Sequence, residues 1–321
     1  MYKSEIIADS LSPQGDRLTT FIIQLPRIVL AELNTHRMFS RNSASSRAIP
    51  TSKMIRMVEE NPFVPIAWQK KHRGMQGTEY FTERSDIMLE INEWFRDRDY
   101  AVDSAKRRLA RGVSKQLCNR LLEPFMWHKV ILTTSEEGLE NFFKLRCPQY
   151  YDRIQENYKR SRKDISSHNE YGDYPKSYED ELAWLQINES QADIHIQKVS
   201  EMMWDSYSSS KPKELEAGEW HIPFGDNITG ENFKLLCDNN PYDNEEELQV
   251  QIATARCARL SYNNFVGKDD YAADIQLYQT LAKMEHWSPF EHCARAMSNL
   301  EYNSYFRGKN DIEPDYMAIA E

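Results

Sequence analysis

The spacing of apolar residues near the start of the chain changes from that of a strand to that of a helix. Residues 17–25 (RLTTFIIQL) are rich in the β-branched side chains typical of strands, and Pro26 ends this segment. Apolar residues then recur at helical spacing, at Ile28, Val29, Leu30 and Leu33. We therefore predict a strand followed by an amphipathic helix that frays near Phe39.

Further helices and one further strand follow from the same kind of pattern. The apolar spacing over 80–112 predicts an amphipathic helix followed by a second helical stretch, and residues 130–134 are strand-like. Residues 136–157 indicate a helix that turns four apolar side chains inward, Leu139, Phe142, Phe143 and Leu145. Helical spacing returns at 252–262 and 277–284, so the chain is expected to mix strands and helices.

The stretch 158–245 is far more polar than the segments on either side of it. It contains charge runs at 158–164 and 244–247, with loop-like segments between them. We predict that this stretch forms a peripheral, mainly helical insertion within a single domain that spans residues 1–321.

The segment HWSPFEH, near the end of the chain, carries residues that commonly begin a helix. Ser288 as N-cap, Pro289 at the first helical position and Glu291 at the third would form a capping box. This prediction explains Ser288 and Glu291 without a ligand, but it leaves His286 and His292 without a role. A zinc site on the two histidines is not expected, because no Cys/His quartet has metal-ligand spacing.

Composition limits the class of protein. A length of 321 residues with 40% hydrophobic residues is enough for a substantial core. The net charge of −10 argues against a nucleic-acid coat, because binding to a phosphate backbone needs an excess of Lys and Arg. The five cysteines are far apart and form no C-x-x-C pair, so we expect them to be reduced. No segment approaches the roughly 20 apolar residues of a membrane helix, and we expect a cytoplasmic protein with no membrane partner.

The segment 34–50, which follows the first predicted helix, has the composition of an anion site. Small polar residues let backbone N–H groups approach a ligand, and arginines supply charge and paired donors. The small polar residues are Ser40, Asn42, Ser43, Ser45 and Ser46, and the cations are Arg37, Arg41 and Arg47. A local basic pocket in an acidic chain suits a mononucleotide. The alternative is a solvated turn of serine and arginine that binds nothing.

Two further arginines lie near predicted core segments. Arg120 precedes an apolar run and is expected at the edge of the core, unless it forms an ion pair with Glu123. Asn141 and Arg146 lie on neighbouring faces of one predicted helix. The alternative for Arg146 is an ion pair with Asp152 on the same helix, which would make its role structural.

Taken together, these segments resemble the motifs of the flavin-dependent thymidylate synthases. The first is His36-Arg37-x-x-Ser40-x-Asn42-x-x-Ser45-x-Arg47, in which Thr35 and Ser43 replace an arginine and a glutamate usual in that family. Two more, similar to the family's nucleotide-binding arginine and its Asn-Phe-x-x-Leu-Arg helix, are Arg120-x-x-x-Pro124 and Asn141-Phe142-Phe143-x-Leu145-Arg146. The last two are Ala258-Arg259-Leu260-Ser261-Tyr262 and His286-x-Ser288-Pro289-Phe290-Glu291-His292.

The order of these motifs differs from that of the family. There the Ala-Arg-x-Ser and Pro-Phe-Glu-His segments precede the His-Arg signature, whereas here they close the chain. We interpret the chain as a circular permutant, a rearrangement that is physically easy when the two termini lie close together. The interpretation predicts that residues 16–20 and 295–300 lie close together in one sheet region.

The resemblance implies an α/β (α+β) fold in which a mixed or antiparallel sheet is flanked by helices. It also implies transfer of a one-carbon unit from methylenetetrahydrofolate to C5 of dUMP, with FAD carrying the hydride and NADPH recharging it. In the family the active sites are shared between the subunits of a homotetramer. The implied partners are therefore dUMP or another pyrimidine nucleotide, folate and further copies of the chain.

The resemblance also gives each matched residue an expected role. Arg146 would be the catalytic residue that polarises the pyrimidine. The residues expected to hold the dUMP phosphate are Ser45, Arg47 and Arg120, with Glu32 nearby where the family has a glutamine. The residues expected to line the flavin are His36, Arg37, Asn42, Asn141, Ser261, Ser288 and Glu291, with His286 on the folate side.

Two other functions stay open. Glu32, Ser43 and the altered stretch 147–151 allow a flavin- and folate-dependent C5-hydroxymethylase of dUMP or dCMP, in which water meets the one-carbon intermediate. A non-catalytic protein that kept the nucleotide pocket but lost turnover is the alternative outside the enzymes.

Overall fold

The computed structural model describes residues 1–74, 77–166, 177–239, 244–260 and 270–310, and it is built on a five-stranded mixed sheet. Its spatial order is β3-β4-β2-β1-β7, and only the pairing of β1 with β7 is parallel. The strands are β1 (Lys3–Leu11), β2 (Arg17–Pro26), β3 (Ser40–Ser43), β4 (Trp127–Ser135) and β7 (Lys213–Glu214). The two strands predicted from the sequence and the mixed α/β fold are confirmed.

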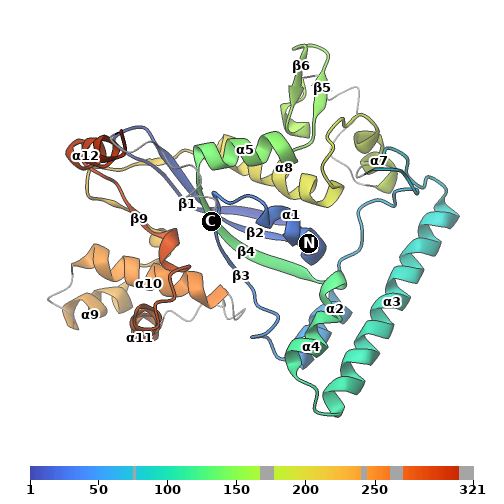
Figure 1. Ribbon diagram of the computed structural model, residues 1–321, viewed down its shortest axis with the longest axis horizontal. Helices are drawn as coiled ribbons and strands as arrows, with labels where there is room; N and C mark the ends of the chain where they lie inside the picture. Colours follow the sequence, from blue (N-terminus) through green and yellow to red (C-terminus); the bar gives the residue numbers. More distant parts are fainter. Residues whose placement is uncertain (75–76, 167–176, 240–243, 261–269, 311–321) are drawn as a thin grey trace.

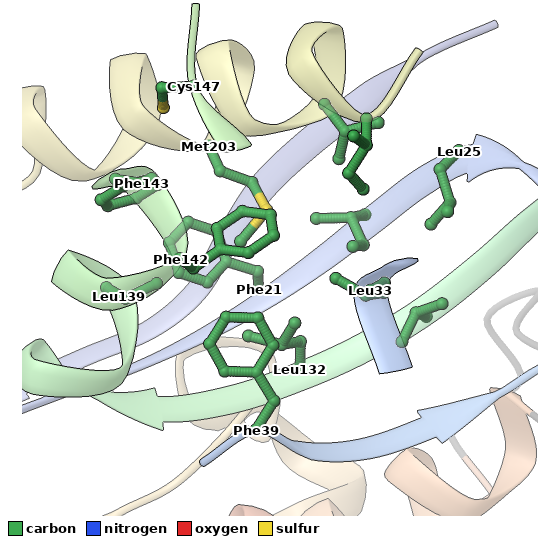
Figure 2. Close-up of a cluster of buried hydrophobic side chains, with 14 of the residues drawn as sticks. Phe21, Leu25, Leu33, Phe39, Leu132, Leu139, Phe142, Phe143, Cys147 and Met203 are labelled. Atoms are coloured by element: carbon green, nitrogen blue, oxygen red, sulfur yellow. The ribbon is translucent and has the colours of Figure 1, made fainter. Parts of the chain in front are cut away.

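Helices cover both faces of this sheet (Figure 1). Helices α5 (Glu136–Arg146) and α8 (Ile194–Ser209) cover one face, and α10 (Glu245–Arg259) and α11 (Tyr271–Lys283) lie on the other. The largest core cluster joins Phe21, Leu132 and Phe142 to Met203 of α8 (Figure 2). Neighbouring Ile22 and Ile131 point the other way, toward Cys257 and Leu260. This alternation is the period of a strand buried on both faces.

A second cluster lies beyond the start of β4. It packs α2 (Thr51–Glu60), α3 (Arg84–Ala110) and α4 (Lys115–Arg120) together around Met54, Val102 and Leu122. Figure 1 shows α3 running apart from the sheet. The described part of the chain also contains the helices α1 (Leu30–Asn34), α7 (Tyr178–Gln186), α9 (Glu231–Asn239) and α12 (Asn299–Asn310). Two small sheets pair β5 (Tyr150–Asp152) with β6 (Asn157–Lys159) and β8 (Trp220–His221) with β9 (Ala294–Arg295).

Several predicted boundaries are wrong for local reasons. Helix α1 ends at Asn34 instead of fraying near Phe39, because Ser40–Ser43 pairs with β4 as an edge strand. The two helical stretches predicted over 80–112 form one continuous helix, α3. Helix α5 ends at Arg146, since Cys147 is extended before Pro148, and Leu145 is 53% exposed instead of inward.

The capping box predicted near the end of the chain does not form. Pro289 precedes a single 3-10 turn over Phe290–His292, and no side chain caps it. The chain then extends into β9, which pairs with β8, so the backbone is drawn into a strand where the local residues favour a helix.

Part of the polar stretch 158–245 belongs to the main core. Helix α8 contributes Ile196, Val199 and Met203 to the largest cluster, and β7 pairs with β1. The description as a peripheral insertion therefore fails for α8, which turns an apolar face to the sheet.

Residues near the end of the described chain lie beside the β1–β2 turn. The Gln14 amide donates to the carbonyl oxygen of Met297 at 3.1 Å and to Asn299 at 3.0 Å. Arg295, however, pairs with Trp220 in a separate two-stranded sheet. The closeness predicted from permutation is present at this turn, but the shared sheet is not.

Candidate functional site

Arg146 lies at the end of α5 and is held by two uncharged partners. Its Nε donates to Nε2 of His36 at 3.1 Å, and its Nη2 donates to the Thr35 hydroxyl at 3.2 Å. Among the described residues, no carboxylate lies within ion-pair distance of this guanidinium. The alternative pairing with Asp152 is wrong, because that carboxylate accepts three backbone N–H bonds of its own. Arg146 is therefore an oriented cation whose charge is not neutralised nearby.

His36 is the neutral support of Arg146. It is only 5% exposed and packs against Phe39 and Phe142, with ring centroids 5.5 and 4.9 Å away. Burial, followed by the charges of Arg146 and Arg41, lowers its pKa to about 4. At neutral pH the ring is uncharged, and since Nε2 accepts from Arg146, its proton is on Nδ1.

Strand β3 separates two of the sequence-predicted residues by its alternation. Arg41 pairs with Leu132, which belongs to the core under α5, and its Nη1 donates to the carbonyl oxygen of Leu33 at 3.0 Å. Asn42 pairs with Ile131, which belongs to the cluster under α10. Since cross-strand partners share a face, Arg41 lies on the side of Arg146 and the buried Asn42 on the opposite side.

The residues expected to bind phosphate lie around the loop that follows β3. The Ser45 hydroxyl accepts the backbone N–H of Arg47 at 3.3 Å. The Asn119 amide donates to the carbonyl oxygens of Ser46 at 2.7 Å and Ile49 at 2.9 Å, which ties this loop to the end of α4. Arg120 follows Asn119, so the exposed Arg47 and Arg120 are brought to one region of the surface.

The alternative ion pair of Arg120 with Glu123 is wrong. Glu123 lies 3.6 Å from Nε of Arg27 instead, and Arg120 is exposed. In the described part of the chain, neither Arg120 nor Arg47 has a carboxylate within ion-pair distance. Both guanidinium groups are thus available to an anion.

A pocket of about 260 Å³ adjoins this loop and adds residues that the sequence motifs did not indicate. Its lining includes Ala44 and Ser46 from the loop, Arg27 from the 3-10 turn that follows β2, and His128 and Lys129 from β4. Burial, helped by the charge of Arg27, lowers the pKa of His128 to about 3, so the ring is neutral. No sequence motif contains Arg27 or Lys129, and the turn after β2 lies beside β4 only because these two strands pair.

The remaining expected residues lie elsewhere. His286, Ser288 and Glu291 follow α11, where His286 and Glu291 are exposed and Ser288 is half-buried. Asn141 is exposed on α5, and Arg37 is exposed three residues after the end of α1. Ser261 lies outside the described residues.

Glu32 is half-buried on α1 and differs from these residues in one carboxylate oxygen. Its Oε2 is buried and has no hydrogen-bond partner among the described residues. A bound molecule or water that donates a hydrogen bond would satisfy this oxygen.

In one chain these residues form three groups at separate places around β3. Arg146 and His36 lie at the end of α5, Arg47 and Arg120 lie by α2 and α4, and the segment after α11 lies on the opposite face of the sheet (Figure 1). A nucleotide phosphate and a reacting ring would therefore need surfaces from more than one place.

Comparisons with solved structures find similar backbones at low identity. Two are of the UMP/dUMP methylase PolB from Streptomyces cacaoi, bound with 5-Br dUMP or 5-Br UMP. Each is 16% identical to this chain. The 5-Br dUMP complex matches over 60% of this chain and 67% of its own, with TM-score 0.40. The 5-Br UMP complex matches over 65% of this chain and 89% of its own, with TM-score 0.44. A third is thymidylate synthase X (ThyX) from Helicobacter pylori with FAD and dUMP, 13% identical over 59% of this chain and 67% of that one, with TM-score 0.30.

This last protein is of the family that the sequence motifs resemble. No protein-family model and no curated protein sequence matches the chain. Likenesses at this level concern the course of the backbone alone, and the chemistry has to come from this chain's own residues.

Proposed function

We propose that the chain is a flavin-dependent enzyme that transfers a one-carbon unit to C5 of a pyrimidine nucleotide and reduces it, forming dTMP from dUMP. The observation that carries the proposal is the state of Arg146. It is half-buried, oriented by two hydrogen bonds to neutral groups, and without a carboxylate partner among the described residues. A cation held in this way is suited to an oxygen that becomes negative during a reaction.

Arg146 would act on the pyrimidine carbonyl. This oxygen gains negative charge only as C5 attacks the one-carbon unit, so the interaction strengthens from ground state to transition state. His36 fixes the direction of the guanidinium and remains uncharged, since burial keeps its pKa at about 4. A protonated histidine at this place would repel Arg146 and could no longer accept its Nε–H.

Arg47 and Arg120 would bind the nucleotide phosphate, together with the Ser45 hydroxyl. Both arginines are exposed and lie in one region because Asn119 ties the loop to α4. A phosphate keeps its charge throughout the reaction, so these contacts favour binding over turnover.

The polar groups present also fit a flavin dinucleotide. The exposed Arg37 could bind its phosphates, and polar side chains could meet its ring and ribityl groups, namely Asn42, Asn141, Ser288 and Glu291. FAD, when bound, supplies the hydride, methylenetetrahydrofolate the carbon and NADPH the reducing equivalents. His286 would lie on the folate side. The groups are separate in one chain, which supports an active site shared between subunits of a homotetramer. The contacts of Gln14 with Met297 and Asn299 support a permuted single domain.

A C5-hydroxymethylase is the second candidate, and Thr35 favours it. The family has an arginine at this position, whereas here the Thr35 hydroxyl accepts from Arg146 and donates to the carbonyl oxygen of Glu32 at 2.7 Å. A hydroxyl beside Arg146 offers a place for water, which a bulky cation would exclude.

Mass analysis of the product distinguishes these functions. The purified protein is incubated with FAD, methylenetetrahydrofolate and NADPH, and with dUMP or dCMP. A product heavier by CH₂ supports the proposal, and one heavier by CH₂O supports the hydroxymethylase. Nucleotide binding with neither product and no flavin uptake would identify a non-catalytic binder and overturn both enzyme proposals.

A further inference from the structure

A continuous chain of buried hydrogen bonds crosses the sheet on the face of α10. The Thr133 hydroxyl lies 2.8 Å from Nδ1 of His292 and 2.7 Å from the Thr20 hydroxyl. Thr20 lies 2.8 Å from Nε2 of His221, whose Nδ1 lies 2.9 Å from the Ser10 hydroxyl. All five side chains are at most 6% exposed. We call them the buried relay.

The two ends of the buried relay differ. Ser10 lines a cavity of about 380 Å³ together with Asp226 and Glu246, so its hydroxyl has an exit to water and carboxylates. At the other end, Nε2 of His292 is buried and has no hydrogen-bond partner among the described residues. Buried polar atoms in folded proteins nearly always have partners, so this nitrogen marks a place where a ligand or water completes the chain.

Only two arrangements of protons satisfy every internal bond of the buried relay and also use both threonine hydrogens inside it. Each buried hydroxyl has one hydrogen, and if that hydrogen is not to be left without a partner, a donor at one end sets the direction of every bond that follows. Either both histidines carry the proton on Nδ1 and donate toward Ser10, or both carry it on Nε2 and donate in the opposite sense. The tautomers of His221 and His292 are therefore linked through Thr20 and Thr133.

We propose that the buried relay is a proton-transfer path that connects Nε2 of His292 with the cavity at Ser10. Without a ligand both histidines carry their proton on Nδ1, because an unpartnered lone pair costs less than an unpartnered N–H.

Transfer through the buried relay needs no charged intermediate to persist. A proton arriving at Nε2 of His292 displaces the Nδ1 proton to Thr133. The proton of Thr133 passes to Thr20, and the proton that Thr20 carried passes to Nε2 of His221. The Nδ1 proton of His221 passes to Ser10, and the proton of Ser10 leaves to water in the cavity. One proton enters and one leaves, and nothing is oxidised or reduced. Burial lowers the pKa of both histidines to about 4, which disfavours a stored imidazolium.

The path reaches the turn Phe290–His292, in which Glu291 directly precedes His292 and which follows Ser288, four residues before His292 in the chain. The proposal does not depend on which nucleotide the enzyme uses. It only requires that a proton donor binds next to this turn.

Selective ¹⁵N labelling of histidine and NMR of the full chain test the proposal. Signals of the two rings are assigned by their loss in His221→Gln and His292→Gln. Both rings should show the Nδ1–H tautomer, and opposite tautomers would overturn the linkage. Thr133→Val should shift the signals of both rings, including His221, which Thr133 does not contact directly. Thr133→Ser keeps the hydroxyl and should leave both tautomers unchanged.

Thr134→Val is the matched control. Thr134 is equally buried and next in the strand, but its hydroxyl donates to Met38 at 3.1 Å, outside the buried relay. It should not move either ring's tautomer. If Thr133→Val does not fold, Ser10→Ala serves instead: it removes the acceptor of His221, and His292 at the far end should shift toward Nε2–H. An unchanged His292 in that variant would refute the relay.

Discussion

Replacing Arg146 by alanine should lower turnover much more than it lowers nucleotide affinity. The pyrimidine oxygen acquires charge only in the transition state, so losing the cation aimed at it should reduce kcat by roughly 10²–10³-fold, on the scale of a lost oxyanion donor. KM for the nucleotide should change little, since the ground-state carbonyl is neutral. Steady-state kinetics with dUMP measures both quantities.

The contacts of Arg146 also indicate how much Arg146→Ala should lower the free energy of unfolding. The substitution removes two hydrogen bonds to neutral groups and leaves Nε2 of the buried His36 without its donor, which should lower the free energy of unfolding by about 1–3 kcal/mol. The variant should therefore fold, and its loss of activity should exceed its loss of stability. Denaturant unfolding at neutral pH measures the second quantity.

The same substitution should raise the pKa of His36, which is visible without any substrate. The charge of Arg146 is a secondary cause of the low pKa, after burial, so the value should rise above about 4 but stay below 6.5. Arg146→Lys keeps the charge and serves as the control, with a smaller rise. A stable Arg146→Ala protein with near-normal kcat would refute the catalytic assignment, and an unchanged His36 pKa would refute the described contact.

Three further predictions concern binding, packing and pH. Arg47→Ala and Arg120→Ala should raise KM with little change in kcat or melting temperature, because both side chains are exposed; a kcat effect as large as that of Arg146→Ala would contradict this division. Arg162→Met should destabilise the protein by about 3–5 kcal/mol in denaturant unfolding, because it removes the paired cation of the buried Glu201 and leaves Glu181 with only Lys198 at 4.0 Å. Lys106→Ala, which breaks an exposed ion pair, should cost about 1 kcal/mol or less, and equal effects would contradict the argument. Burial lowers the pKa of four histidines from 6.5 to about 3–4, namely His36, His128, His221 and His292. Between these pH values the unfolded chain binds more protons than the folded chain, so the free energy of unfolding should fall as the pH is lowered from 6.5 toward 4. Denaturant titrations across this window measure it, and a flat profile would show that these histidines are not buried in the neutral form.

Local patterns in the sequence were sufficient for the central strands and for the principal helices. The run 17–25 and residues 130–134 became the two strands at the middle of the sheet, because β-branched side chains buried on both faces leave few other choices. The sequence was also sufficient to single out Arg146, Arg47 and Arg120, since motif spacing is independent of packing. In the described residues, no helix is long and apolar enough to cross a membrane.

Tertiary pairing decided what the local residues left ambiguous. The side chains of Ser40–Ser43 are too polar for the sequence to predict a strand. The segment nevertheless pairs with the edge of β4, because its backbone N–H and C=O groups form hydrogen bonds there. The turn at Phe290–His292 has the residues of a helix start, but pairing of β9 with β8 draws the chain onward. Helix α8 looked peripheral because the stretch around it is polar, while its own apolar face packs on the sheet.

The partners of the site residues were likewise beyond the sequence. His36 lies 110 residues from Arg146, and Thr133 lies 159 residues from His292, so no spacing rule links them. Charge alone suggested that Arg120 pairs with Glu123 and Arg146 with Asp152, because these acids are near in the chain. Folding placed Arg27 beside Glu123 and a neutral histidine beside Arg146 instead, and the pairing of β2 with β4 brought Thr20 and Thr133 face to face. The sequence by itself thus determined which residues are candidates for the site and where the central strands run, whereas contacts between distant segments decided which of those residues are neutral, paired or connected.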